Sequence, residues 1–229
     1  MPLHVIQLLT KEELETVQRT IASATFGDGA VTSGVIARQA KHNQELSPEG
    51  SEGGALINQI LTRAFSRHAI YRAWALPREN TAFIVNRYEE GMYYDDHVDN
   101  GVHDFGGGRW VRSDLAITVF LSDPSTYDGG ELVIDSDRES NMVKLRVGEA
   151  VVYPATSIHR VERVRRGVRI AAVCWVESLI RDGAQRALLF DLATVIETTL
   201  REEPTPQRQK TLTSLSKVRH NLLRMWVDR

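Results

Sequence analysis

A few polar residues in the middle of this chain are suited to hold a metal ion. His97 and Asp99 form a His-x-Asp pair, and His159 follows 62 residues after His97. Two imidazoles and one carboxylate on one face of an ion leave the opposite coordination positions open for other molecules. We therefore expect His97, Asp99 and His159 to be metal ligands at a catalytic centre.

The types of ligand favour Fe(II) over a structural zinc ion. A strand directs residues i and i+2 to one side, so His97 and Asp99 converge while Val98 points away. Imidazole nitrogen and carboxylate oxygen suit Fe(II), and the single cysteine, Cys174, excludes a zinc site rich in thiolates. His103 lies close by in the sequence, but we do not expect it to be a fourth ligand.

Arg169 follows His159 by ten residues and begins a hydrophobic run. Strands that follow each other in a β-sandwich can lie in opposite sheets, so His159 and Arg169 can both point into the space between them. A guanidinium in an apolar interior needs an anion, and its planar fork fits the distal carboxylate of 2-oxoglutarate. The alternative is a surface position with its neighbours Arg160, Arg163, Arg165 and Arg166.

Two tyrosines precede the metal-binding pair in the pattern Tyr-x-x-Gly-x-x-Tyr-x-x-His-x-Asp, namely Tyr88 and Tyr94. Their hydroxyl groups can hydrogen-bond the oxygens of a co-substrate beside the metal. The alternative is that they are ordinary half-buried strand aromatics. We expect Tyr88 to be the more important of the two.

The hydrophobic pattern predicts helices at both ends of the chain and strands between them. Thr10 and Glu13 form a capping-box signature, and the helical period returns after Ser178. The expected helices are 11–24, 53–68 and two amphipathic C-terminal helices with apolar residues from 188 to 200 and from 212 to 226. The expected strands are 31–37, 81–88, 115–121, 131–134, 150–153, 158–164 and 168–176, with loop over most of 38–54.

These elements predict a mainly β protein with flanking helices, whose natural closed form is a jelly roll. We expect three regions: 1–77 with N-terminal helices and loops that pack on the core, 78–178 as the jelly-roll domain, and 179–229 as a C-terminal helical extension. The apolar faces of the last two helices are expected to pack on the β-region, or else to form a subunit interface in a homo-oligomer.

The composition indicates an ordinary globular protein. Hydrophobic residues make up 42% and charged residues 25%, which excludes disorder and fibrous repeats. The formal net charge of −2 gives no reason to expect nucleic acid or a membrane as partner. One cysteine cannot form an intrachain disulfide, and the N-terminus lacks a signal-peptide pattern, so we expect a cytoplasmic location.

The sequence resembles the Fe(II)- and 2-oxoglutarate-dependent dioxygenases of the prolyl 4-hydroxylase type, and more narrowly the bacterial PKHD-type hydroxylases. Most of the chain takes part in this resemblance. The segments that carry it are 27–29 with 32–34, 41–44, 86–92, 97–100, 128–132, 148–149, 153–154, 157–161 and 167–169.

The resemblance implies a double-stranded β-helix with iron on His97, Asp99 and His159. It also implies 2-oxoglutarate anchored by Arg169, L-ascorbate as a reductant and a link to iron uptake. Animal members use a further tyrosine on the strand after the His-x-Asp pair to hold the co-substrate. The comparable stretch 117–121 has none, and Thr118 is the expected substitute.

Residues 101–112, with three glycines at 106–108, are expected to form a mobile lid over the metal, the alternative being a flexible surface loop. The substrate is a peptide, prolyl-like, or a small molecule such as a siderophore, and we expect residues 32–47 and the lid to contact it. Two other functions fit the same ligands. One is a non-catalytic sensor of metal or 2-oxo acid, and the other is a zinc hydrolase, which Arg169 disfavours.

Overall fold

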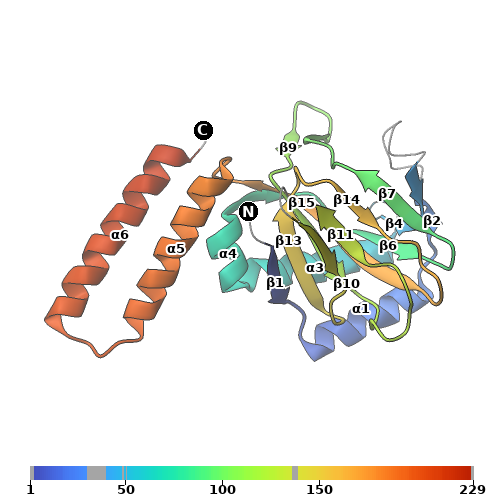
Figure 1. Cartoon of the computed structure of the whole chain (residues 1–229), viewed down its shortest axis with the longest axis horizontal. Helices are drawn as coiled ribbons and strands as arrows, with labels where there is room; N and C mark the ends of the chain where they lie inside the picture. Colours follow the sequence, from blue (N-terminus) through green and yellow to red (C-terminus); the bar gives the residue numbers. More distant parts are fainter. Residues whose placement is uncertain (1–2, 30–39, 48, 50, 136–138, 228–229) are drawn as a thin grey trace.

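Two antiparallel sheets form the centre of the protein (Figure 1). The computed structural model describes residues 3–29, 40–47, 49, 51–135 and 139–227. The strand predicted at 31–37 lies outside these residues. The first sheet, here called the major sheet, contains in spatial order β1 (His4–Gln7), β13 (Glu149–Pro154), β10 (Leu115–Phe120), β15 (Arg169–Ser178), β6 (Ile84–Tyr88), β4 (Gln44–Leu46) and β2 (Gly27–Asp28), while β5 (Pro77–Asn80) pairs with the far end of β15.

The second, minor sheet has five strands. Their order is β12 (Ser140–Val143), β11 (Leu132–Asp135), β14 (His159–Val161), β7 (Tyr93–His97) and β3 (Lys41–His42). A separate hairpin of β8 (Val102–Asp104) and β9 (Trp110–Arg112) follows β7. The chain passes from β14 in the minor sheet to β15 in the major sheet, which confirms the expected change of sheet between His159 and Arg169.

The alternation of side chains along the central strands divides the interior into two cores. On β10, Ile117 and Val119 pack toward the helices, whereas Ala116 and Phe120 pack between the sheets. All six residues of β10 are buried for this reason. On β15, Ala172 and Cys174 belong to the helix-side core, so the alternate residues, Arg169 among them, are directed between the sheets.

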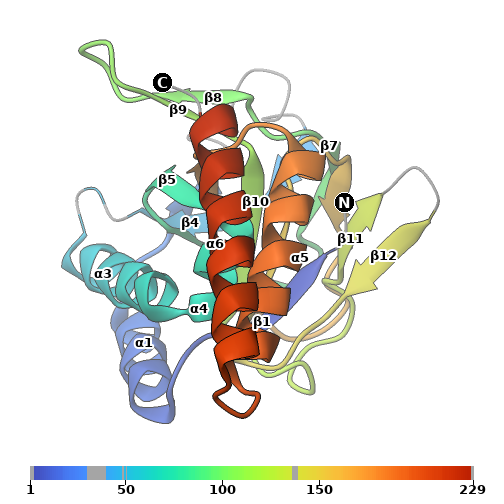
Figure 2. The ribbon, with the colours of Figure 1, turned by 90° about the vertical axis from the view of Figure 1, so that its left-hand side faces the viewer.

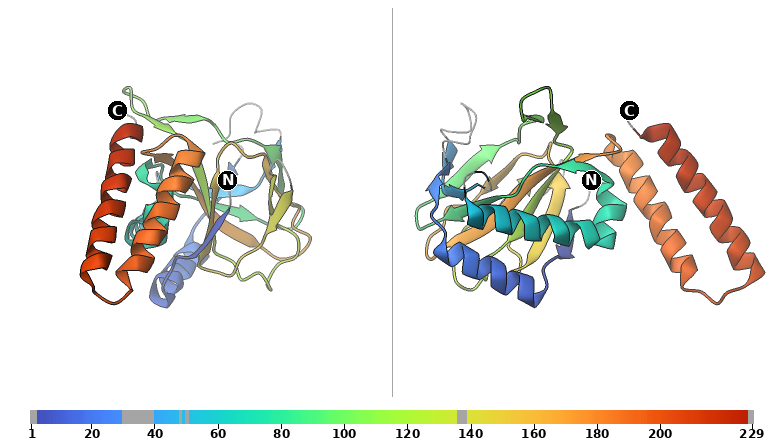
Figure 3. Two further views of the ribbon diagram at one scale, coloured as in Figure 1. Left: turned by 60° about the vertical axis from the view of Figure 1, so that its left-hand side comes forward. Right: turned by 180° about the vertical axis from the view of Figure 1, so that it is seen from behind.

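Helices α1 (Lys11–Ser23), α3 (Glu52–Arg67) and α4 (Ala69–Ala75) cover the outer face of the major sheet (Figure 3). The predicted helices 11–24 and 53–68 are confirmed. The capping box is present, since the Thr10 and Glu13 side chains each accept a backbone N–H at the start of α1. The expectation of loop over most of 38–54 was wrong in part: 41–42 and 44–46 form short strands, because they pair with β7 and β6.

The two predicted C-terminal helices are α5 (Gly183–Leu200) and α6 (Pro206–Trp226), and they form an antiparallel hairpin beside the sheets (Figure 2). The apolar face of α5 packs on α4 and α6 and reaches the β-region only at its edge, where Phe190 meets His4 of β1. The expectation that these faces pack on the sheets was therefore correct only at this edge. None of the described helices is long and apolar enough to cross a membrane.

Candidate metal and co-substrate site

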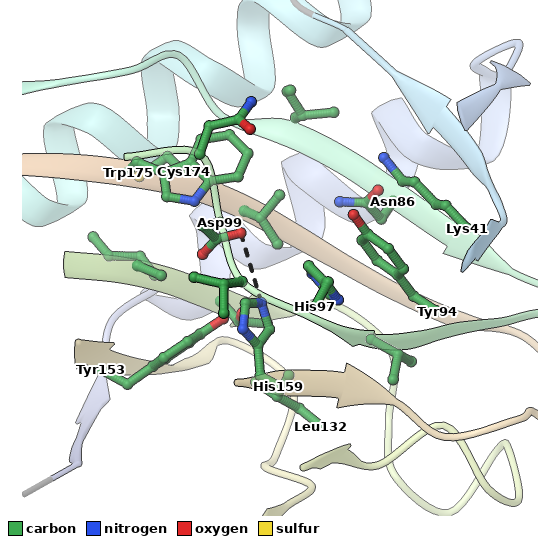
Figure 4. A pocket seen from close by; sticks show the side chains of 18 of the residues that line it. Lys41, Asn86, Tyr94, His97, Asp99, Leu132, Tyr153, His159, Cys174 and Trp175 are labelled. Carbon is green, nitrogen blue, oxygen red and sulfur yellow. Dashed lines mark ion pairs between the residues drawn. The ribbon is translucent and has the colours of Figure 1, made fainter. Parts of the chain in front are cut away.

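The three predicted ligands lie together between the sheets. One ligand atom from each of His97, Asp99 and His159 can be chosen so that all lie within 4.8 Å of one another. Asp99 Oδ1 is 3.7 Å from His159 Nε2 (Figure 4). His97 ends β7 and His159 begins β14, and the two residues are direct partners across the minor sheet. Asp99 follows the strand rather than belonging to it, but the expected alternation persists, because Val98 is 53% exposed.

A β-bulge in β7 sets the orientation of His97. The pairing of β7 with β14 shifts by one residue between His159↔His97 and Val161↔Tyr94, so β7 holds one extra residue in this interval. In a regular strand, residues i and i+3 point to opposite faces. The bulge brings Tyr94 and His97 to the same face, where their rings stack with centroids 3.5 Å apart at 12°. The bulge therefore turns His97 toward the ligand cluster.

Backbone carbonyls fix which imidazole nitrogen is free to bind a metal. His97 Nδ1 lies 2.8 Å from the Asp95 carbonyl, and His159 Nδ1 lies 3.1 Å from the Ser157 carbonyl. A carbonyl only accepts, so each Nδ1 carries the proton and donates it, which leaves Nε2 as a lone-pair donor. The Trp175 indole N–H hydrogen-bonds the Asp99 carboxylate and orients this third ligand.

Burial shifts the pKa values of two of the three ligands. Burial and the neighbouring His159 lower the pKa of His97 to about 3, so this imidazole is neutral at physiological pH. Burial raises the pKa of Asp99, and His159 opposes that rise. A buried carboxylate gains most from a nearby positive charge. The donor set and its geometry therefore fit a divalent transition-metal ion.

Arg169 lies in the same interior and not in the surface arginine cluster. It is 2% exposed, and its guanidinium carbon lies 5.2 Å from the Tyr88 ring centroid and 5.5 Å from that of Phe120. Its Nε has no hydrogen-bond partner, and within the described part of the chain no carboxylate forms an ion pair with it. By contrast, Arg160 and Arg165 pair with surface carboxylates. A buried guanidinium without a counter-ion fits an anionic ligand.

The metal ligands and Arg169 line one cavity of about 180 Å³. Tyr88, Tyr94 and Thr118 line it too, so the structure brings together every site residue expected from the sequence. Burial raises the pKa of Tyr88 to about 12, which keeps its phenol protonated as a hydrogen-bond donor. Thr118 is 2% exposed and hydrogen-bonds the Tyr153 side chain.

The cavity is also lined by residues to which the sequence assigned no role in the metal or co-substrate site, among them Tyr153, Trp175, Lys41, Glu45 and Asn86. Lys41 and Glu45 form a buried ion pair, their side chains being only 10% and 5% exposed. Burial raises the pKa of Tyr153, whose ring lies 5.3 Å from His159. The sequence did contain a signal for Trp175, because alternate residues along β15 share the face of Arg169 and Trp175 is one of them. Lys41 and Glu45 fall within residues 32–47, which were expected to contact the substrate, but no local pattern predicted the short strands β3 and β4 that carry them.

The segment expected to be a lid is a β-hairpin. Its turn contains Gly106, Gly107 and Gly108, all with positive φ in open space, a conformation that L side chains rarely adopt. The His103 ring on β8 packs against Trp175 with ring centroids 4.3 Å apart and a tilt of 31°; it lines the cavity but is not part of the ligand cluster. The hairpin thus borders the cavity as expected, and its motion stays a prediction.

Comparison with known proteins identifies the family. Residues 83–177 match the model of the 2OG-Fe(II) oxygenase superfamily, and residues 183–228 match that of the PKHD-type hydroxylase C-terminal domain. A PKHD-type hydroxylase of Caulobacter sp. (strain K31) is 42% identical over the full length of both chains. The PKHD-type hydroxylase YbiX of Escherichia coli O7:K1 is 38% identical, again over both full lengths. The chain belongs to the PKHD-type hydroxylases. As a member of this family it is a 2-oxoglutarate- and Fe(II)-dependent oxygenase.

Solved structures share the fold of this PKHD-type hydroxylase at much lower identity. A prolyl hydroxylase of Trichoplax adhaerens, in complex with a peptide fragment of hypoxia inducible factor, is 17% identical with a TM-score of 0.55, and the match covers 81% of this chain and 86% of that one. HygX of Streptomyces hygroscopicus, with nickel, 2-oxoglutarate and hygromycin B bound, is 15% identical with a TM-score of 0.52, over 77% and 82%. The likeness concerns the fold.

Proposed function

We propose that this PKHD-type hydroxylase binds Fe(II) through His97, Asp99 and His159 and hydroxylates its substrate with decarboxylation of 2-oxoglutarate to succinate. The observation that carries the proposal is that a three-ligand cluster and a buried arginine line one cavity, and that this arginine has no counter-ion among the described residues. When bound, Fe(II) supplies the activation of dioxygen. The protein supplies fixed ligands, a charged anchor and shelter from water.

Arg169 is proposed to hold the distal carboxylate of 2-oxoglutarate through its planar fork. Tyr88 lies under the guanidinium and is a protonated donor, so it is placed to hydrogen-bond the same molecule. Thr118 and Tyr94 are proposed as further contacts from the walls. Because Thr118 and Tyr153 are hydrogen-bonded to each other, they act as a pair, which replaces the strand tyrosine of the animal enzymes.

Three further expectations belong to the same proposal. The strands of residues 78–178 in the two facing sheets form a double-stranded β-helix, between an N-terminal region 1–77, which adds strands β1–β4 at the edges, and a C-terminal region 179–229. L-Ascorbate reduces iron that has been oxidised without substrate. The helical hairpin α5–α6 is a candidate subunit interface, since Leu188, Val195 and Val218 are about half exposed on it.

The proposed substrate is a peptide, prolyl-like, or a small molecule, with a connection to iron uptake in the latter case. Structural neighbours include both kinds, a hydroxylase bound to a peptide and HygX bound to hygromycin B. Of residues 32–47, expected to contact the substrate, Lys41 and Glu45 line the cavity, and 32–39 lie outside the described residues.

The proposal is tested in two stages. Anaerobic addition of Fe(II) and 2-oxoglutarate should produce the charge-transfer absorption of the chelate, and admission of oxygen should release succinate. His97→Ala and Asp99→Ala should abolish both signals. Succinate release at the wild-type rate by either variant would refute the assignment. A metal or 2-oxo acid sensor would give the absorption without succinate, and a zinc hydrolase would give neither.

A further inference from the structure

Among the described residues that line the cavity, two have a buried side-chain nitrogen with no hydrogen-bond partner. One is Nε of Arg169 and the other is Nε2 of His103. A buried polar atom without a partner destabilises the protein, so such atoms in a binding cavity indicate ligand contacts. The proposed function assigns 2-oxoglutarate to Arg169, and nothing yet accounts for His103.

The two nitrogens belong to opposite ends of the cavity. Arg169, Val173 and Trp175 lie on the inner face of β15, and Arg169 is separated from Trp175 by six residues, about 20 Å of extended strand. Trp175 contacts the metal ligand Asp99 on one side and the His103 ring on the other. A co-substrate that reaches from the metal to Arg169 therefore extends away from His103.

Trp175 and apolar side chains line the His103 end of the cavity, and the Trp175 indole N–H is used by Asp99. The charged pair of Lys41 and Glu45 lies across the cavity, beside Tyr94 and Asn86 (Figure 4). Ile84 and Val173 contribute apolar walls. The ligand that fits this end is an apolar group that carries a neutral hydrogen-bonding atom, as a residue within a peptide does.

We propose that His103 Nε2 hydrogen-bonds the substrate, and that the substrate is an apolar residue, prolyl or aliphatic, flanked by neutral peptide groups. His103 is thus a specificity-determining residue on the β8–β9 hairpin. The proposal rests on the proposed function, since it takes Arg169 as the anchor of 2-oxoglutarate. It favours the peptide over a charged small molecule.

The test uses capped tripeptides, acetyl-Ala-X-Ala-amide with X as Pro, Val or Leu, and the full chain loaded with Fe(II) and 2-oxoglutarate without oxygen. His103→Phe keeps the ring on Trp175 and removes Nε2. We expect calorimetry to show at least one peptide binding to the wild type and about tenfold weaker binding to His103→Phe, the loss of one hydrogen bond. His220→Phe, the same replacement at an exposed histidine of α6, is the matched control and should bind as the wild type does.

Each outcome separates this inference from the proposed function. If the wild type gives no charge-transfer absorption with Fe(II) and 2-oxoglutarate, the proposed function fails. If that absorption forms but no capped peptide binds, the substrate class is wrong. If peptides bind equally to the wild type and His103→Phe, or if His103→Phe weakens 2-oxoglutarate binding instead, the role of His103 is refuted.

Discussion

Replacement of Arg169 by methionine should remove the preference of the site for a ligand that has a distal carboxylate. The guanidinium is 2% exposed, so solvent screens its interactions very little. A hydrogen bond to a charged group contributes about 1.5–3 kcal/mol. The planar fork makes two such bonds to one carboxylate, which gives about 3–6 kcal/mol, or about 10²–10⁴-fold in affinity. Arg169→Lys keeps the charge but loses the fork, and should lose about half of this free energy.

The assay is anaerobic titration of the Fe(II) enzyme, with the charge-transfer absorption as readout and two ligands compared. One is 2-oxoglutarate, and the other is 2-oxopentanoate, which has a methyl group in place of the distal carboxylate. The wild type should prefer 2-oxoglutarate by about 10²–10⁴-fold, and Arg169→Met should bind both ligands alike. Because the buried charge has no carboxylate partner among the described residues, the apo form of Arg169→Met should unfold at no lower temperature than the wild type. An equal loss of affinity for both ligands would refute the reasoning.

Three further predictions concern the metal site and the turns. Without metal, the wild type should lose stability as pH falls from 6.5 toward 3, because the unfolded state binds a proton that His97, with its pKa lowered to about 3, does not take up in the folded state. Measured by urea denaturation, the free energy of unfolding of His97→Asn should depend less steeply on pH over this range. Asp99 is present in both proteins, so its contribution is the same in the two. Mn(II) at 100 times its dissociation constant should add about 2.7 kcal/mol, or about 5–10 °C in Tm by calorimetry, and Asp99→Ala should remove this shift. Gly167→Ala should destabilise more than Gly91→Ala in chemical denaturation, since both have positive φ but only at Gly167 would a Cβ lie 2.3 Å from the Thr126 carbonyl; equal losses would contradict the steric argument.

The sequence was sufficient for the parts of the site that depend on residue type and strand period. His97, Asp99 and His159 meet as expected, and Arg169 points inward because the period of two along β15 carries it there with Trp175. The main helices could be predicted equally well, because their helical patterns of apolar residues extend over many residues and α1 has its capping box.

What escaped prediction depends on long-range pairing. The strands that carry Lys41 and Glu45 are two and three residues long and exist through their partners in β7 and β6, so no local pattern marks them. The packing of α5 on α4 was also hidden, because an apolar helix face does not say which surface covers it.

The extra residue in β7 has a consequence for how this protein tolerates insertion and deletion. Loss of Asp95 or Asp96 would leave Tyr94 and His97 two residues apart in a regular ladder opposite β14, so both rings would stay on one face. A single deletion there should therefore be tolerated better than replacement of a ligand, whereas a single insertion should turn His97 away from Tyr94. The glycine turn at 106–108, only ten residues further along, has open space around it and should accept added residues.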